Sequence, residues 1–283
     1  MKIFSNKISK AIKITNRARY IKSEPYSTNS FQMTQKLEAK TSLWQRLRNF
    51  FGFRTKLNPK SFANGSHTLQ KPFICSKLAA ELSEEYLRTN YLSENQKIID
   101  GFRDAGGGAS FDNFGKVLYA KREVITIDKE LDVYLQNAIN YVKQNTVQMS
   151  EKKKLKFIYN LMLDISGDAQ KAVERSELLG NRAAGEERLL GKIFEHGAAV
   201  CRHKALMFKI LADEVGIKTR ILRGNMMDFG GVGRHVWNEV KLKDGRKILI
   251  DIQNCKIIEV KNSSKNAKLV SYLTENNVPI YYK

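Results

Sequence analysis

The stretch that most constrains how this chain folds runs from residue 197 to residue 251, where a helix pattern is followed by three strand patterns. Apolar residues recur at helical spacing on one face of the helix: Ala205, Phe208, Ala212 and Val215. The pattern predicts a helix that begins at or just before Cys201. We expect this helix to end at Gly216, because glycine is the residue that most often follows a helix. The local sequence therefore places a cysteine in the first turn of a helix.

The strands predicted after this helix cover residues 217–223, 235–242 and 247–251. The Asp244-Gly245 pair between the last two favours a tight type I′ hairpin. With that hairpin closed, Asp251 lies on the strand that pairs with the one starting at His235. An imidazole and a carboxylate are thereby expected on neighbouring strands.

Cys201, His235 and Asp251 stand in the order of a nucleophile, a base and an orienting carboxylate. A thiol at a helix N-terminus lies at the positive end of the helix dipole, which favours the reactive thiolate. A carboxylate beside the imidazole would accept its Nδ1–H and leave Nε2 facing the thiol. Each residue also has a plainer interpretation: a small buried hydrophobe for Cys201, a surface side chain for His235 and a strand-end cap for Asp251. The ordered set of three is harder to obtain by chance than any one member.

The segments 92–102, 200–213 and 217–224, with His235-Val-Trp-Asn-Glu-Val and Ile248-Leu-Ile-Asp, resemble a known family. It is the transglutaminase-like branch of the papain-like cysteine hydrolases. The chain is most similar, over about residues 91–260, to the transglutaminase-like domain N-terminal to plant Raf-like, CTR-type kinases. This resemblance implies an α+β fold with a papain-like core, a helical N-terminal part, and the Cys-bearing helix packed on an antiparallel sheet. It also implies a Cys201/His235/Asp251 triad.

Members of this superfamily cleave, deamidate or transamidate amides, whereas the plant domains serve largely as regulatory modules. The sequence therefore favours a cysteine-dependent amide hydrolase or acyltransferase, of protease, deamidase or transglutaminase type, that acts on a protein or peptide. The alternative is a catalytically inert module of the same fold that binds a protein or a membrane surface.

Two other residues near the predicted nucleophile have candidate roles. His196 could supply a second oxyanion donor, or it is an ordinary loop histidine. Trp237 shares the strand face of His235 and either walls the site or belongs to the core. A metal site built from the histidines and Cys201 is a poor chelate, since Cys201 and His203 point about 200° apart on a helix. We therefore expect no metal and no cofactor.

Residues 1–72 are predicted to form a basic, partly flexible leader, with 15 Lys and Arg against 2 Asp and Glu. Their net charge of +13 leaves +7 of the total +20 for residues 73–283, the predicted transglutaminase-like domain. Residues 41–54 predict an amphipathic helix whose apolar stripe is Leu43, Leu47, Phe50 and Phe51. This helix could lie on an anionic membrane, dock on a partner protein or fold back on its own domain. No specific nucleic-acid binding is expected, because the basic residues match no recognisable binding fold.

Three cysteines without a CxxC pair leave one over from any disulfide, which favours a reducing compartment. No run approaches the roughly 18 apolar residues of a membrane span, and the N-terminus lacks the apolar core of a secretory signal. We expect the cytoplasm or another reducing compartment. The basic leader leaves peripheral membrane association and a non-classical export route open.

The remaining predictions concern the scaffold. Helices are expected at residues 76–90, 131–142 and 152–163, and short strands at 116–119 and 123–127. Residues 166–190 are expected to form a helical or mobile insert. The triglycine at 106–108 favours a turn over a phosphate loop, because no Lys-Ser/Thr pair follows it. Residues 224–233 are expected to be a mobile lid or a loose hairpin loop.

Overall fold

The computed structural model describes residues 76–106, 109–111, 117–182, 184–228, 231–260 and 271–281. Its helices are α3 (Lys77–Thr89), α4 (Val133–Thr146), α5 (Glu151–Ile165), α6 (Ala169–Arg182), α7 (Leu190–Glu195) and α8 (Cys201–Glu214). Its strands are β1 (Tyr91–Leu92), β2 (Arg103–Asp104), β3 (Ser110–Phe111), β4 (Val117–Tyr119), β5 (Val124–Thr126), β6 (Glu187–Leu189), β7 (Thr219–Asp228), β8 (Gly231–Lys241), β9 (Lys247–Asp251), β10 (Lys256–Val260) and β11 (Tyr272–Leu273). The leader of residues 1–72 and its predicted helix over 41–54 lie outside the described residues.

The mixture of helices and antiparallel strands confirms the predicted α+β class. The first helix, α3, confirms the helix predicted over residues 76–90. The side chain of Ser76 accepts the N–H of Ala79, and Asn90 closes the helix in the left-handed conformation with φ 57°. Ser and Asn are preferred at these two positions because each satisfies backbone groups that the helix itself leaves unpaired.

The helices predicted over residues 131–142 and 152–163 are present as α4 and α5. The stretch 166–190 is helical over most of its length, as α6. Its last residues instead form β6, which pairs in parallel with β5 and adds an edge to the small sheet β2-β5-β6. Periodicity could not predict β6, because three residues are too few to show an alternation.

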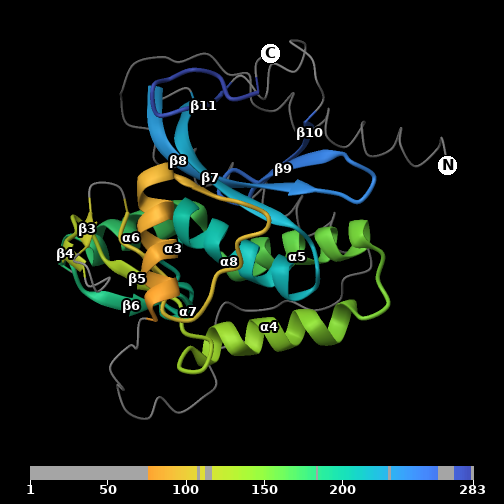
Figure 1. Ribbon diagram of the computed structural model, residues 1–283, viewed down its shortest axis with the longest axis horizontal. Helices are drawn as coiled ribbons and strands as arrows, with labels where there is room; N and C mark the ends of the chain where they lie inside the picture. Colours follow the sequence, from red (N-terminus) through yellow and green to blue (C-terminus); the bar gives the residue numbers. More distant parts are fainter. Residues whose placement is uncertain are drawn as a thin grey trace, which may run out of the picture. The chain divides into compact units, whose positions relative to one another are not determined.

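The main sheet has the strand order β1-β7-β8-β9-β10, and β11 pairs alongside β1 on β7 (Figure 1). Every neighbouring pair in it is antiparallel. Strand β9 has the predicted bounds, and Gly245, with φ 82°, lies in the predicted turn that joins it to β8. The sheet therefore carries the His235 and Asp251 strands side by side, as expected.

The lid or loose loop predicted over residues 224–233 is wrong. Strand β7 continues to Asp228, and β8 starts at Gly231, four residues before His235. The two strands pair with each other from Gly224 opposite His235 to Asp228 opposite Gly231. The end of β7 stays an extended strand because β11 pairs with its other edge, with Tyr272 opposite Met226 and Leu273 opposite Asn225.

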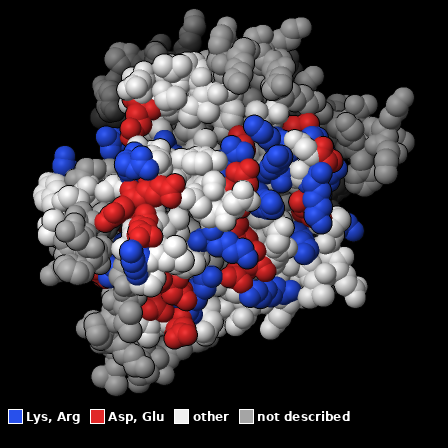
Figure 2. Space-filling model, viewed as in Figure 1, with Lys and Arg blue, Asp and Glu red and all other residues white. Residues whose placement is uncertain are grey.

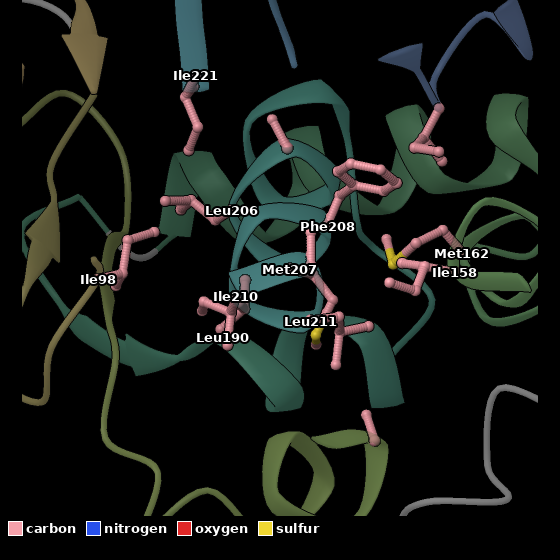
Figure 3. Packing of buried hydrophobic residues seen from close by; sticks show 14 of the residues in the cluster. Ile98, Ile158, Met162, Leu190, Leu206, Met207, Phe208, Ile210, Leu211 and Ile221 are labelled. Atoms are coloured by element: carbon pink, nitrogen blue, oxygen red, sulfur yellow. The ribbon is translucent and has the colours of Figure 1, made fainter. Parts of the chain in front are cut away.

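Helix α8 packs against β7 and β8 on one side and against α4 and α5 on the other (Figure 1). Its apolar side chains are therefore buried all round the helix, not on one face as predicted (Figure 3). Those at most 2% exposed include Leu206, Met207, Phe208, Ile210 and Leu211. Because the core surrounds α8, its first residue is fixed relative to the sheet.

Acidic and basic side chains lie next to one another over the face shown in Figure 2. Ion pairs such as Lys129 with Glu214, at 2.9 Å, belong to this mixed surface chemistry. It agrees with the modest +7 that the sequence leaves to residues 73–283. Within the part of the chain that the structure describes, no helix has the length and apolar character needed to cross a bilayer.

Candidate active site

Cys201 is the first residue of α8, as the sequence predicts. Val200 precedes the helix in extended conformation, and its N–H donates to Nδ1 of His203 at 3.0 Å. Cys201 is intermediate between buried and exposed as a residue, and it forms no disulfide. Because Cys201 is the first residue of α8, it lies at the positive end of the helix dipole, among backbone N–H groups that have no partner within the helix.

His235 and Asp251 are hydrogen-bonded, with Nε2 of the imidazole 2.8 Å from Oδ2 of the carboxylate. Both side chains are buried. The expectation that Nδ1 faces the carboxylate is wrong. The register pairs Asn238 with Ile250, which sets Asp251 level with Trp237 rather than with His235. The carboxylate of Asp251 is therefore a diagonal neighbour of His235 across the two strands, and it contacts Nε2, the ring nitrogen farther from the backbone.

The other ring nitrogen, Nδ1, is left for Cys201, and the imidazole and the sulfur shift each other's pKa. Burial opposes ionisation of the thiol. The hydrogen bond and charge of His235, with the N–H of Val236, outweigh burial and lower the pKa of Cys201 below its ordinary value. For His235, burial is likewise outweighed, by Asp251 and the sulfur, and its pKa rises to about 10. Together these shifts favour a thiolate beside an imidazolium at neutral pH.

Asp251 is held by two residues that sequence reasoning missed. Nδ2 of Asn254 and the hydroxyl of Tyr272 each donate to its Oδ2 at 2.8 Å. Burial would raise the pKa of Asp251, but the bonds from His235, Asn254 and Tyr272 lower it below its ordinary value. An Asn three residues after a strand-ending Asp is a turn signal that could have found Asn254. Tyr272 has no local signal, because it belongs to a distant segment.

Trp237 stacks beside the imidazole of His235, with ring centroids 6.0 Å apart and an angle of 17° between the planes. It is 1% exposed, and its Nε1 donates to the hydroxyl of Tyr281 at 3.0 Å. The ring of Tyr272 meets it edge-on at 5.0 Å. Trp237 therefore belongs to the core and lies against the imidazole, while its role as a wall of the site stays a prediction.

Gly224 allows β11 to bring Tyr272 to this position. A Cβ at residue 224 would lie 2.2 Å from the carbonyl oxygen of Leu273 and 3.2 Å from the ring of Trp237. Any side chain there would push β11 away from β7. The glycine is thus required by a close approach of two backbones.

Asn238 ties the sheet to the cysteine helix. Its Nδ2 donates to the carbonyl oxygen of Ala205 at 3.1 Å and lies 3.4 Å from that of Arg220. The side chain is 1% exposed, so water does not compete for these bonds. Because β8 also carries His235, this contact links the position of the imidazole to that of the sulfur.

His196 lies at the C-terminal end of α7 and is exposed. Its Nδ1 is 2.6 Å from the carbonyl oxygen of Lys192, so the ring contacts its own helix. His203 is fully buried and points towards Glu123, with 3.2 Å between Nε2 and Oε1. Among the described residues, no three His, Cys, Asp or Glu side chains come together as a metal site would require.

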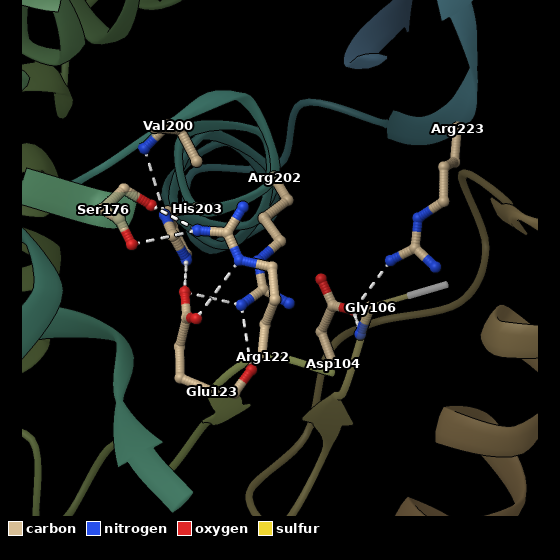
Figure 4. Close-up of polar contacts among 9 residues, drawn as sticks. All are labelled: Asp104, Gly106, Arg122, Glu123, Ser176, Val200, Arg202, His203 and Arg223. Atoms are coloured by element: carbon tan, nitrogen blue, oxygen red, sulfur yellow. Dashed lines mark hydrogen bonds and ion pairs between the residues drawn. The ribbon is translucent and has the colours of Figure 1, made fainter. Parts of the chain in front are cut away.

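Arg202 and His203 belong to a buried ionic cluster on another side of α8 (Figure 4). Arg202 Nη2 lies 2.7 Å from Glu123 Oε1, and both side chains are almost fully buried. Burial would raise the pKa of Glu123, but His203 and Arg202 hold it well below its ordinary value. Burial lowers the pKa of His203 to about 4, so its ring is neutral at pH 7. This cluster anchors the first turn of α8 to β5 and leaves His203 unavailable to Cys201.

Comparison with known proteins agrees with this description. A family model described as EDR1/CTR1/ARMC3, peptidase-like, matches residues 78–256. That segment is more than half of the chain and contains Cys201, His235 and Asp251. Among curated proteins, none matches the chain. The family model describes the transglutaminase-like domain that lies N-terminal to Raf-like kinases, which confirms the resemblance predicted from the sequence. The chain belongs to the EDR1/CTR1/ARMC3 peptidase-like family.

Proposed function

We propose that this domain is a cysteine-dependent amide hydrolase or acyltransferase that acts on a protein or peptide through Cys201, His235 and Asp251. The observation that carries the proposal is the 2.8 Å bond between His235 Nε2 and Asp251 Oδ2, because it leaves Nδ1 of the same ring for the thiol. Papain-like hydrolysis requires this order of thiolate, imidazolium and orienting group.

In the proposed reaction, the thiolate of Cys201 attacks the carbonyl carbon of an amide and forms a C–S bond. The N–H of Cys201, at the helix N-terminus, stabilises the oxygen that becomes negative. As the C–N bond breaks, the imidazolium of His235 gives its Nδ1 proton to the departing amine. The product of this step is a thioester on Cys201. His196 stays outside the mechanism, because its ring contacts Lys192.

The second step releases the acyl group. Neutral His235 takes a proton from water or from an acceptor amine, which attacks the thioester carbon. The C–S bond breaks, the proton returns to the Cys201–His235 pair, and an acid or a new amide leaves. Asp251 keeps the ring oriented throughout, and Asn254 and Tyr272 hold Asp251.

The test compares two free thiols of one molecule. Cys255 is exposed, whereas Cys201 is only partly exposed. A peptidyl vinyl sulfone, followed by mass spectrometry of each cysteine peptide, should label Cys201 faster than Cys255 at pH 6. A glutamine-containing peptide mixture should release ammonia or free amine, and Cys201→Ala should abolish the release. Equal labelling of the two thiols, with no release, would contradict the proposal.

The second candidate is a catalytically inert module of the same fold. The partial burial of Cys201 favours it, because a substrate has less room to reach the sulfur. A module would keep its full biological effect in Cys201→Ala, whereas an enzyme would lose it. The same variant therefore decides between the two candidates.

A further inference from the structure

One edge of β8 has no partner strand next to the candidate active site. Strand β9 pairs with β8 only from Asn238 to Lys241, and it ends at Asp251, level with Trp237. Strand β8 continues from there back to Gly231 (Figure 1). Among the described residues, no other strand pairs with that side of β8. We call residues 231–236 on this side the free edge, since an unpaired strand edge is a template for a further strand.

The pairing with β7 identifies the backbone groups that face the free edge. In an antiparallel pair, residues opposite each other exchange two hydrogen bonds and no hydrogen bond in alternation. The N–H groups of Arg223 and Met227 donate to carbonyl oxygens just before β1 and β11, on the far side of β7. The residues opposite them on β8, Val236 and Val232, therefore turn their N–H and C=O groups away from β7. By the same alternation, Arg234 between them does so as well.

The free edge ends beside the sulfur of Cys201. Nδ2 of Asn238 donates to the carbonyl oxygen of Ala205 at 3.1 Å, which fixes β8 against α8. Cys201 lies about one helical turn before Ala205, and Val236 lies two residues before Asn238. The N–H of Val236 helps to lower the pKa of Cys201, in agreement with this placement. A strand added along the free edge would therefore reach the thiol.

The free edge is open to solvent over residues 231–234, each of which is exposed. Val232 and Met227 lie opposite each other across the two strands and are 51% and 47% exposed, so they offer an apolar contact. A Cβ at Gly233 would meet nothing within 4 Å, so no contact within the described chain requires glycine there. A glycine inside a strand often marks the close approach of another backbone. These features suit an occupant that brings a second backbone and an apolar side chain.

We propose that the free edge of β8 binds an extended polypeptide segment as an additional strand and delivers one of its amides to Cys201. This inference deepens the proposed function and rests on it. Main-chain hydrogen bonds to Val232 and Arg234 supply the affinity, and an apolar residue of the segment contacts Val232. At about 3.3 Å per residue, Val232 lies about 13 Å along the strand from Val236. The segment must therefore extend about four residues to one side of the reacting amide.

The experiment first measures binding without reaction, in Cys201→Ala. The probe is the nonapeptide acetyl-Val-Thr-Glu-Thr-Gln-Thr-Glu-Thr-Val-amide, whose β-branched residues favour an extended chain. In either chain direction it can place a valine opposite Val232 and a glutamate opposite Arg234 when its glutamine is at residue 236. Amide hydrogen exchange, resolved by NMR, should slow at Val232 and Arg234 when the peptide is added.

Two variants at one position separate the backbone from the side chain. Arg234→Pro removes an N–H that faces the free edge and leaves the bonds between β7 and β8 in place. It should raise the Kd of the peptide by about tenfold, as expected for the loss of main-chain hydrogen bonds. Arg234→Ala keeps the N–H and should raise the Kd by about threefold or less, the effect of one exposed ion pair.

A second substitution covers the case in which Arg234→Pro disturbs the adjacent His235. Val232→Pro also removes an outward N–H, three residues from His235, and is judged by the same rise in Kd. Alkylation by iodoacetamide of Cys201, restored in each variant, checks that the candidate active site is intact.

Three outcomes would overturn the proposal: unchanged exchange at Val232 and Arg234, slowing confined to the edge strand β10, or equal Kd values in Arg234→Pro and Arg234→Ala. Slowing that is present without peptide and grows with protein concentration would also overturn it, because a second copy of the chain would then occupy the edge. Failure of the proposed function is seen separately. In that case the peptide binds at the free edge, but wild-type Cys201 forms no thioester with it and releases no ammonia.

Discussion

The outer ring nitrogen of His235, Nε2, lies 2.8 Å from Oδ2 of Asp251. The nitrogen nearest the backbone, Nδ1, is therefore the one available to the sulfur of Cys201. This assignment determines which proton the proposed reaction moves, because Asp251 fixes the tautomer from the far end of the ring.

Asp251→Asn should slow acylation of Cys201 by roughly a thousandfold, while the fold is kept. An amide of the same shape removes the negative charge that raises the pKa of His235, so the thiolate and imidazolium pair loses its support. The measurement is the rate of thioester formation with an activated acyl substrate. Asp244→Asn, on the exposed hairpin turn, is the control and should be silent. Equal rates in the two variants would contradict the orienting role of Asp251.

The pH profile of acylation should show two limbs. Towards acid, the rate should fall only below the ordinary range of a thiol, because the pKa of Cys201 is lowered. Towards base, it should fall near pH 10, where His235 loses the proton needed by the leaving amine. Single-turnover rates between pH 4 and pH 11 check this. A profile that rises with the ordinary ionisation of a thiol would show that no ion pair exists.

Tyr272→Phe should slow acylation by about tenfold or less. It removes the hydroxyl that donates to Oδ2 of Asp251, and the pKa of that carboxyl should rise in consequence. Tyr281→Phe is the matched control, since its hydroxyl contacts Trp237 and not Asp251. Parallel rates for both variants should be compared at pH 7. A larger effect in Tyr281→Phe would show that acylation depends more on the bond between Trp237 and Tyr281 than on the bond from Tyr272 to Asp251.

Glu123→Gln should destabilise the domain by about 3–5 kcal/mol, because it leaves Arg202 buried without its charge partner. The pKa of Glu123 is lowered by folding, so its contribution is present above the ordinary glutamate pKa and is lost as the pH falls. The variant should therefore lose less stability than the wild type between pH 6 and pH 3. Urea unfolding followed by circular dichroism at both pH values measures this. Identical pH dependence in the two proteins would count against the ion pair.

The basic leader gives a prediction from the sequence alone. If residues 41–54 form a helix that lies on anionic lipid, Leu47→Glu should abolish binding to phosphatidylserine vesicles by placing a charge in the apolar stripe. Added salt should weaken binding of the unaltered chain. Vesicle sedimentation of the full chain measures both effects. Binding that survives Leu47→Glu would point to simple charge attraction.

The positions of Cys201 and Asp251 at the ends of their helix and strand could be predicted from the sequence near each residue. The start of α8 at Cys201 and the end of β9 at Asp251 follow from helix and strand signals close to each residue. The pairing of β8 with β9 follows from the Asp244-Gly245 turn. The neighbourhood of the three candidate residues was therefore predictable before any coordinates.

Contacts between distant segments were not predictable. Asp251 contacts Nε2 of His235 because the register of β8 and β9 makes these two residues diagonal neighbours rather than opposite ones. Residues 224–233 extend as paired strands because β11 covers the other edge of β7, which no local signal announces. The charged residues Arg202 and Lys204 lie on a helix that is buried on all sides, where an amphipathic pattern would place them in solvent.

Tyr272 reaches Asp251 from a strand that begins 71 residues after the first residue of the cysteine helix, Cys201. During synthesis, Cys201, His235 and Asp251 would thus be translated before Tyr272, whose hydroxyl donates to the carboxylate of Asp251. Under the proposed function, full reactivity would be withheld until translation had passed residue 273.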